Sequence, residues 1–109
     1  MVDKLVKETL ESLGVPVSRL LCKGNANTFI TFQLVLGART KFYDDECEGK
    51  EYVYRADIYS RSDYTQLLAK AETALETLEC YEIKIDPEYF ESDTGYYHVP
   101  ITFKIFIEN

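Results

Sequence analysis

Apolar residues recur at the spacing of an amphipathic helix in two stretches of the chain. In residues 2–13 they fall on one face, and Gly14 indicates where that helix stops. A second stripe, within residues 63–79, is formed by Tyr64, Leu67, Leu68, Ala71, Leu75 and Leu78. Ser62 and Asp63 precede it and supply oxygens for an N-terminal cap. The pattern predicts two helices that each bury one face in a core.

Alternating apolar and polar residues, rich in aromatic and β-branched types, predict strands around these helices. The predicted strands are residues 17–21, 28–37, 50–61, 81–86 and 99–107. Residues 39–43 continue the second strand, with Gly37 at a bulge or bend, so residues 28–61 form a long hairpin. Pro87 ends the fourth strand, and residues 87–97 are predicted to be a loop.

The period-two rule assigns strand residues to faces. In the second strand one face holds Ile30, Phe32, Leu34 and Leu36. In the third, Tyr52, Tyr54, Ala56 and Ile58 alternate with Val53, Arg55, Asp57 and Tyr59. In the last, one face holds Val99, Ile101, Phe103, Ile105 and Ile107. Each of these strands therefore offers an apolar face to the core.

The resulting element order is α-β-β-β-α-β-β, which predicts an α+β fold. With 109 residues the chain suits one domain, residues 1–109, with an antiparallel or mixed sheet and both helices packed on one of its faces. The loop at 87–97 is longer than a usual hairpin connection, and long ordered loops on small domains often carry function.

The net charge of −7 argues against binding nucleic acid, because a protein that grips phosphates needs a basic surface. No apolar run approaches the ~20 residues that span a bilayer, so no membrane association is expected. The mixed-charge N-terminus is not that of a secretory signal. Three cysteines without a CxxC motif fit a reduced, cytosolic protein. Two of them, Cys22 and Cys80, sit in apolar contexts typical of core residues.

His98 is the only histidine and the main candidate for chemistry. A catalytic pair with one of the cysteines (Cys22, Cys47 or Cys80) stays open, as does a metal site with carboxylates from Glu91 or Asp93. We favour a third interpretation, in which His98 is a structural residue that borders the last strand, where its half-polar side chain suits a sheet edge. The chain also lacks glycine motifs for phosphates and a nucleophile motif. We therefore expect no catalysis, no metal and no cofactor.

Two groups of residues are candidates for contacts with other molecules. Asp44, Asp45, Glu46 and Glu48 make a concentrated negative patch at a hairpin tip, and repulsion or contact with a basic partner suits it better than calcium. Arg55 and Asp57 lie among Tyr52, Tyr54 and Tyr59. That group fits either a solvent-facing strand side or a subunit interface, where tyrosine and arginine are enriched.

Several stretches together resemble a known family. A short helix ends in "LGVPV", an aromatic strand "NTFITFQL" leads to an acidic turn, "ADIYSRSDY" enters a capped helix, and "YFESDTGYYH" leads into the last strand. This order is similar to the small tail completion proteins of long-tailed phages and prophages of Gram-positive bacteria, also described as tail terminator-like or head–tail joining proteins. The resemblance covers nearly the whole chain.

The resemblance implies a non-enzymatic virion assembly protein. Its members form a ring, usually of six copies, at the head-proximal end of the tail tube. The implied partners are further copies of the chain, the major tail tube protein and a head connector or stopper protein. DNA would pass through the channel without specific binding, and the protein would occur in the host bacterial cytoplasm and then in the virion.

On this resemblance, the acidic patch would line or rim the channel. Strands 28–37 and 50–61 and the loop at 87–98 would make subunit and tube contacts, with Tyr52, Tyr54, Arg55, Asp57, Tyr59, Tyr96, Tyr97 and His98 as the interface candidates. A heterologous, head-to-tail contact would close the ring. Two alternatives stay open: another head–tail connector component, such as a stopper or minor capsid protein, or a small-ligand-binding regulatory domain, which would need an apolar pocket with convergent polar groups.

Overall fold

The computed structural model describes residues 2–20, 26–41, 47–78 and 80–108. Two helices and six strands follow one another as α1 (Val2–Glu11), β1 (Val17–Arg19), β2 (Thr28–Lys41), β3 (Cys47–Ser60), α2 (Thr65–Thr77), β4 (Tyr81–Ile85), β5 (Tyr89–Glu91) and β6 (Tyr96–Glu108). The α+β prediction is confirmed, and each predicted helix and strand is present with ends shifted by a few residues. No described helix has the length and apolar content needed to span a bilayer.

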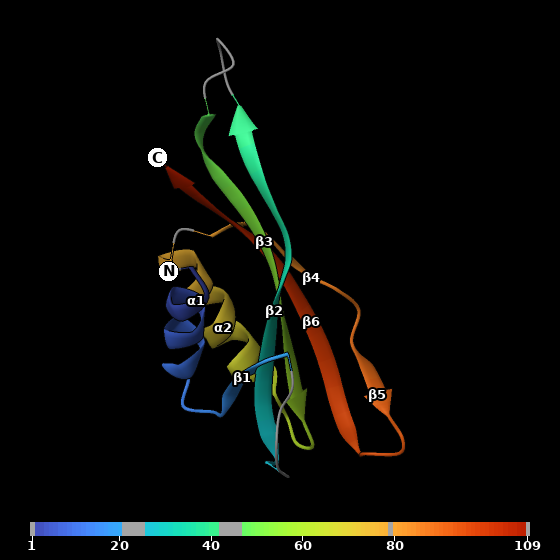
Figure 1. Ribbon diagram of the computed structural model, residues 1–109. Helices are drawn as coiled ribbons and strands as arrows, with labels where there is room; N and C mark the ends of the chain where they lie inside the picture. The colour runs from blue at the N-terminus through green and yellow to red at the C-terminus, as the bar shows by residue number, and fades with distance from the viewer. Residues whose placement is uncertain (1, 21–25, 42–46, 79, 109) are drawn as a thin grey trace.

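All strands belong to one mixed sheet, in the order β1-β2-β3-β6-β4, with β5 also pairing with β6. Every pairing is antiparallel except that of β1, which runs parallel to β2. Both helices lie on the same side of the sheet, as Figure 1 shows. The paired ends of β2 and β3 continue past the helices, and the chain measures 52 × 24 × 23 Å along its principal axes (Figure 1).

The core lies between the helix layer and the facing side of the sheet. Its buried members are Val6, Leu10, Ile30, Phe32, Tyr54, Ala56, Ile58, Ala71, Leu75, Val99, Ile101, Phe103 and Ile105. They include the face predicted for the last strand, from Val99 to Ile105, while Ile107 at its end is 40% exposed. Each fully buried aliphatic side chain contributes roughly 1.5–3 kcal/mol, so the helix stripes and the alternating strands stabilise one another.

Local signals position the helix ends. Gly14 has φ +84, and backbone N–H groups of Leu13 and Gly14 donate to the carbonyls of Leu10 and Glu11. A residue without Cβ adopts this left-handed conformation readily, which is why the helix stops there. At the start of α2, the Asp63 carboxylate accepts the Thr65 backbone N–H at 2.9 Å. This hydrogen bond, with a second from the Thr65 hydroxyl at 2.7 Å, lowers the pKa of Asp63.

The hairpin of β2 and β3 has a bulge at Val35, not at Gly37, and a second register shift between Thr40 and Lys41. Leu34 pairs with Tyr54 and Leu36 pairs with Val53, so Val35 is the extra residue. Gly37 stays in register opposite Tyr52. The extra residue shifts the alternation by one, which moves Leu36 to the face opposite Leu34 and overturns the predicted common face. Leu34 and Leu36 are 39% and 56% exposed, on opposite faces of the sheet.

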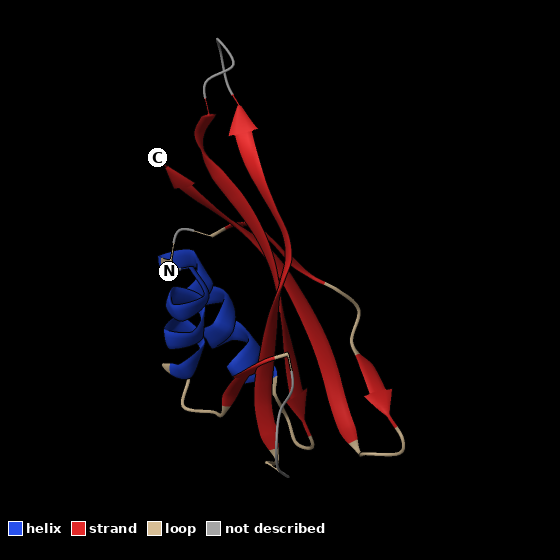
Figure 2. Cartoon of the chain, in the orientation of Figure 1, coloured by secondary structure: helices blue, strands red, loops and turns tan. Residues whose placement is uncertain are grey.

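The segment predicted to be a loop, residues 87–97, contains β5 and the first two residues of β6. Tyr89 pairs with His98 and Glu91 with Tyr96, and a turn with Gly95 at φ +80 joins the two strands. β4 and β5 lie one after the other along the outer side of β6, as Figure 2 shows. The loop prediction was wrong because Pro87 interrupts this edge only locally, and pairing resumes two residues later.

Candidate assembly surfaces

The face of the sheet opposite the helices carries a buried polar cluster built on His98 and Asp57. The two residues stand on neighbouring strands, β6 and β3, two residue pairs apart in register and so on the same face. The His98 Nε2 donates to the Asp57 Oδ1 at 2.7 Å, and the Arg55 Nε donates to the same oxygen at 2.9 Å. The Glu91 Oε2 lies 3.5 Å from the other ring nitrogen, His98 Nδ1. An imidazole thus lies between two carboxylates, with only 3% of its residue surface exposed.

Aromatic rings from four strands surround this cluster. Tyr59 stacks on the His98 ring with centroids 4.1 Å apart, and Tyr89 of β5 contacts it at 4.6 Å. Phe29 of β2 stacks on Tyr59 at 4.7 Å, and Tyr96 meets Phe29 edge-on. Burial, followed by the charges of nearby carboxylates, raises the pKa of Tyr59 to about 12. The His98 ring is buried beneath these rings, and burial strengthens its hydrogen bond with Asp57.

This arrangement corrects the expected position of His98. The residue lies inside β6 with β3 on one side and β5 on the other, rather than at a strand edge. It does have a structural environment, because two tyrosine rings pack against its imidazole and Nε2 is bonded. Its Nδ1 is buried without a hydrogen bond in the described residues, since the 3.5 Å contact with Glu91 is too long.

The cluster is unsuited to a metal site at His98, and of the candidate cysteine partners Cys22 and the Cys47 side chain lie outside the described residues. The two carboxylates meet opposite nitrogens of one ring, so they do not converge on one point where a metal ion could sit. In the described part of the chain, no group of three or more potential ligands has a geometry for a metal. Cys80 packs against the helix-side core, and burial raises the pKa of its thiol to about 11, which favours the unreactive protonated form.

The structure brings together only some of the interface candidates. Arg55, Asp57, Tyr59, Tyr96 and His98 share the face opposite the helices, where all but Arg55 and Tyr59 are buried. The sequence did not single out Phe29 and Tyr89, which complete the cluster. Phe29 pairs with Tyr59 and Tyr89 pairs with His98, so alternation along the strands would assign them to the same face once the strand pairing is known.

The remaining tyrosine candidates lie on the helix side. Tyr54 is 1% exposed in the core, its hydroxyl donates to Asp3, and burial together with that bond raises its pKa. The Tyr54 side chain therefore has no free surface to offer a partner. Tyr97 is 43% exposed beside Tyr64 and Phe90.

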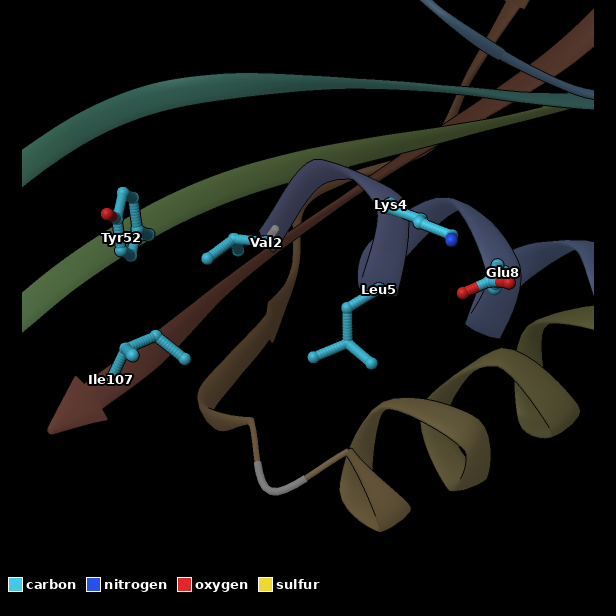
Figure 3. A pocket seen from close by; sticks show the side chains of 6 residues that line it. All are labelled: Val2, Lys4, Leu5, Glu8, Tyr52 and Ile107. Carbon is cyan, nitrogen blue, oxygen red and sulfur yellow. The ribbon is translucent and has the colours of Figure 1, made fainter.

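Tyr52 belongs to an open groove of about 490 Å³ next to the start of α1. Figure 3 shows Val2 and Leu5 of α1 on one side of it, with Tyr52 of β3 and Ile107 of β6 on the other. Its polar lining residues, Lys4 and Glu8, come from the same helix and do not converge from opposite walls (Figure 3). The groove lacks the convergent polar groups that would favour a small-ligand site.

The acidic patch at the hairpin tip falls mostly outside the described residues. Asp44, Asp45 and Glu46 are not described, and Glu48 lies in β3 with only its backbone described. The last described pair of this hairpin before the patch is Lys41 with Cys47.

No protein-family model matches the sequence, and no curated protein matches it either. The fold is similar to that of a chain in the solved structure of the virion of a native gene transfer agent particle, with a TM-score of 0.52 and 12% sequence identity. The similarity covers 95% of this chain and 92% of that chain. At this identity the comparison shows that the two chains share a fold.

Proposed function

We propose that this protein is a structural component of a phage-like virion. The observation that carries the proposal is the similarity of nearly the whole fold to a chain of a gene transfer agent virion, with almost the full length of both chains covered. A shared fold alone does not define function, so the argument also rests on the site. The one histidine is buried between two carboxylates and packed rings, and it presents no open face to a substrate.

Within that class, we propose a tail completion role. The protein would cap the head-proximal end of the tail tube, join the tail to the head, or do both, as a ring of copies that is hexameric in the assembled tail. The resemblance of the sequence to tail completion proteins supports this role, and the long hairpin fits it because an arm that projects from its own core is available to a neighbour. Its partners would be the tail tube protein and a head connector or stopper.

The test is electron microscopy of lysates from the phage or prophage that carries this gene, with the gene stopped early. Free DNA-filled heads beside tubes of abnormal length are expected if the protein caps the tube. Free heads beside tails of normal length would mean that it only joins the two parts. Intact infectious particles would overturn the virion proposal altogether. Pull-down against tube protein and against connector protein then separates tail completion from a stopper role.

The acidic patch has a separate role in this proposal, as the lining or rim of the DNA channel. A negative wall repels the phosphate backbone and prevents DNA from adhering as it passes. Reversing Asp44, Asp45, Glu46 and Glu48 to Lys should slow DNA ejection while tails still form. Reversing four exposed or half-exposed helix acids, Glu8, Glu11, Glu72 and Glu76, is the matched control for net charge. Failure of tail assembly with the first variant alone would make the patch a docking element instead.

A further inference from the structure

The sheet has two outer edges, and they differ in composition. One, which we call the β2 edge, consists of β1 and residues 33–41 of β2. Because β1 pairs only with Ile30–Phe32, residues 33–41 have β3 on one side and no strand among the described residues on the other. The opposite edge, which we call the β4 edge, is residues 81–91, with β4 and β5 in line along β6 (Figure 2).

Exposed apolar side chains concentrate on these two edges. In the described part of the chain, seven of the eleven large hydrophobic residues that are exposed lie there. On the β2 edge they are Leu34, Val35 and Leu36, at 39%, 55% and 56% exposure. On the β4 edge they are Tyr81, Ile85, Tyr89 and Phe90, at 36%, 39%, 48% and 54%. An exposed apolar strand edge is a surface that pairs with another chain unless something covers it.

The two edges also carry opposite charge. The strands β1 and β2 contain Arg19, Arg39 and Lys41 and no acidic residue. Residues 81–91 contain Glu82, Asp86, Glu88 and Glu91 against the single base Lys84. Some of these acids have partners in the chain, such as Glu82 with Lys104 at 2.6 Å, but the Glu82 side chain is still 64% exposed. By sequence, β1 and β2 therefore carry only basic charges and residues 81–91 carry a net negative charge, although Arg19 itself lies 3.5 Å from Asp3.

We propose that copies of this chain associate head to tail, with the β2 edge of one copy against the β4 edge of the next. Opposite charges favour this contact, whereas a two-fold contact would bring like edges together and repel. A heterologous contact of this kind closes into a ring or grows as a filament. Pro87 has no backbone N–H, so side chains and the strands on either side of it make the contact rather than one unbroken ladder.

This inference rests on the proposed ring and assigns the surfaces that build it. It keeps part of two segments expected from the sequence, residues 33–37 of strand 28–37 and residues 87–91 of the loop at 87–98, but not the tyrosines and charges of the strand faces. Tyr54, Asp57 and His98 are buried within their own subunit and are not needed for it.

Charge-reversal variants test the contact directly. The variant R39E/K41E has two acidic edges, and E82K/E88K has two basic edges. Each alone should lose self-association, and an equimolar mixture should regain it with the two variants alternating. Sedimentation velocity and native mass spectrometry of the purified chain at high concentration measure this. Association should weaken with salt, because the screening length falls from about 30 Å at 0.01 M to about 3 Å at 1 M.

Matched controls separate edge charge from net charge. K7E/K70E and E11K/E76K make the same changes in charge on exposed helix residues, and both should associate as the unaltered chain does. Circular dichroism checks that each variant is folded. Because Lys104 lies beside Glu82, E88K alone replaces E82K/E88K if the double variant fails to fold. The proposal is overturned if the unaltered chain stays monomeric in low salt, or if either reversed variant associates alone as the unaltered chain does.

Complementation of the stopped gene distinguishes this inference from the virion role. If the two variants together restore virions and neither does so alone, both proposals are supported. If the stopped gene abolishes virions but each variant alone restores them, the edge contact is wrong while the virion role stands. If virions form without the gene, the virion role is wrong, and the sedimentation result alone then decides the edge contact.

Discussion

The hydrogen bond between Asp57 and His98 allows a quantitative test of the buried cluster. Replacing Asp57 with Ala removes the oxygen that accepts from both His98 Nε2 and Arg55 Nε. The Arg55 side chain is 37% exposed and can turn to water, so its loss costs little. The His98 side chain is 4% exposed and cannot, so its ring nitrogen is left buried without a partner.

The expected cost follows from that difference. A hydrogen bond to a charged group contributes about 1.5–3 kcal/mol, and an unsatisfied buried group costs about 1–3 kcal/mol. The two figures describe the loss of one hydrogen bond and are not added. We therefore expect D57A to lower the free energy of unfolding by about 2–3 kcal/mol. For a chain of this length, 1 kcal/mol corresponds to roughly 4 °C in Tm, so the melting temperature should fall by about 10 °C.

A double-mutant cycle with H98F isolates the pair. Phenylalanine keeps a ring for Tyr59 to stack on but removes both nitrogens. Urea unfolding followed by circular dichroism at neutral pH gives the four free energies, and the coupling between the two sites should be about 2 kcal/mol. A coupling near zero, or a D57A cost under about 0.5 kcal/mol, would contradict the structure's account of the cluster.

Three further predictions concern the framework. G14A should cost about 1 kcal/mol in urea unfolding because φ is +84, whereas G37A, which has no positive φ and only ordinary contacts near its Cβ, should not carry that backbone cost. D63A should destabilise α2 at neutral pH, because the folded-state pKa of the Asp63 carboxyl lies below the usual 3.8. The stability that this carboxylate contributes is fully present above pH 3.8 and is lost as the pH falls through the lowered pKa. Thermal melts of both proteins at several pH values would check this. L75A should cost about 2–5 kcal/mol because the side chain is fully buried, while L36A, at 56% exposure, should stay near neutral in the same unfolding assay.

Periodicity was a reliable guide wherever one face of an element is buried. The stripe that includes Ala71 and Leu75 and the run from Val99 to Ile105 both face the core as the spacing indicates. It failed at Val35, because a single inserted residue reverses the alternation and nothing in "QLVLG" marks which residue is extra. It also missed β5, because three residues beside a proline carry too little pattern to be distinguished from a loop.

The sequence by itself determined both helices and every strand except β5, the α+β class, and the acidic net charge, because these depend on local spacing and composition. Only the tertiary structure decided that Asp57 and His98 form one buried pair, since their contact joins residues 41 apart through the register of β3 with β6. The same holds for the two edges of the sheet. Strand order places β2 and β4 at opposite ends, and no local pattern encodes strand order, so the opposed charge of the edges becomes visible only once the sheet is assembled.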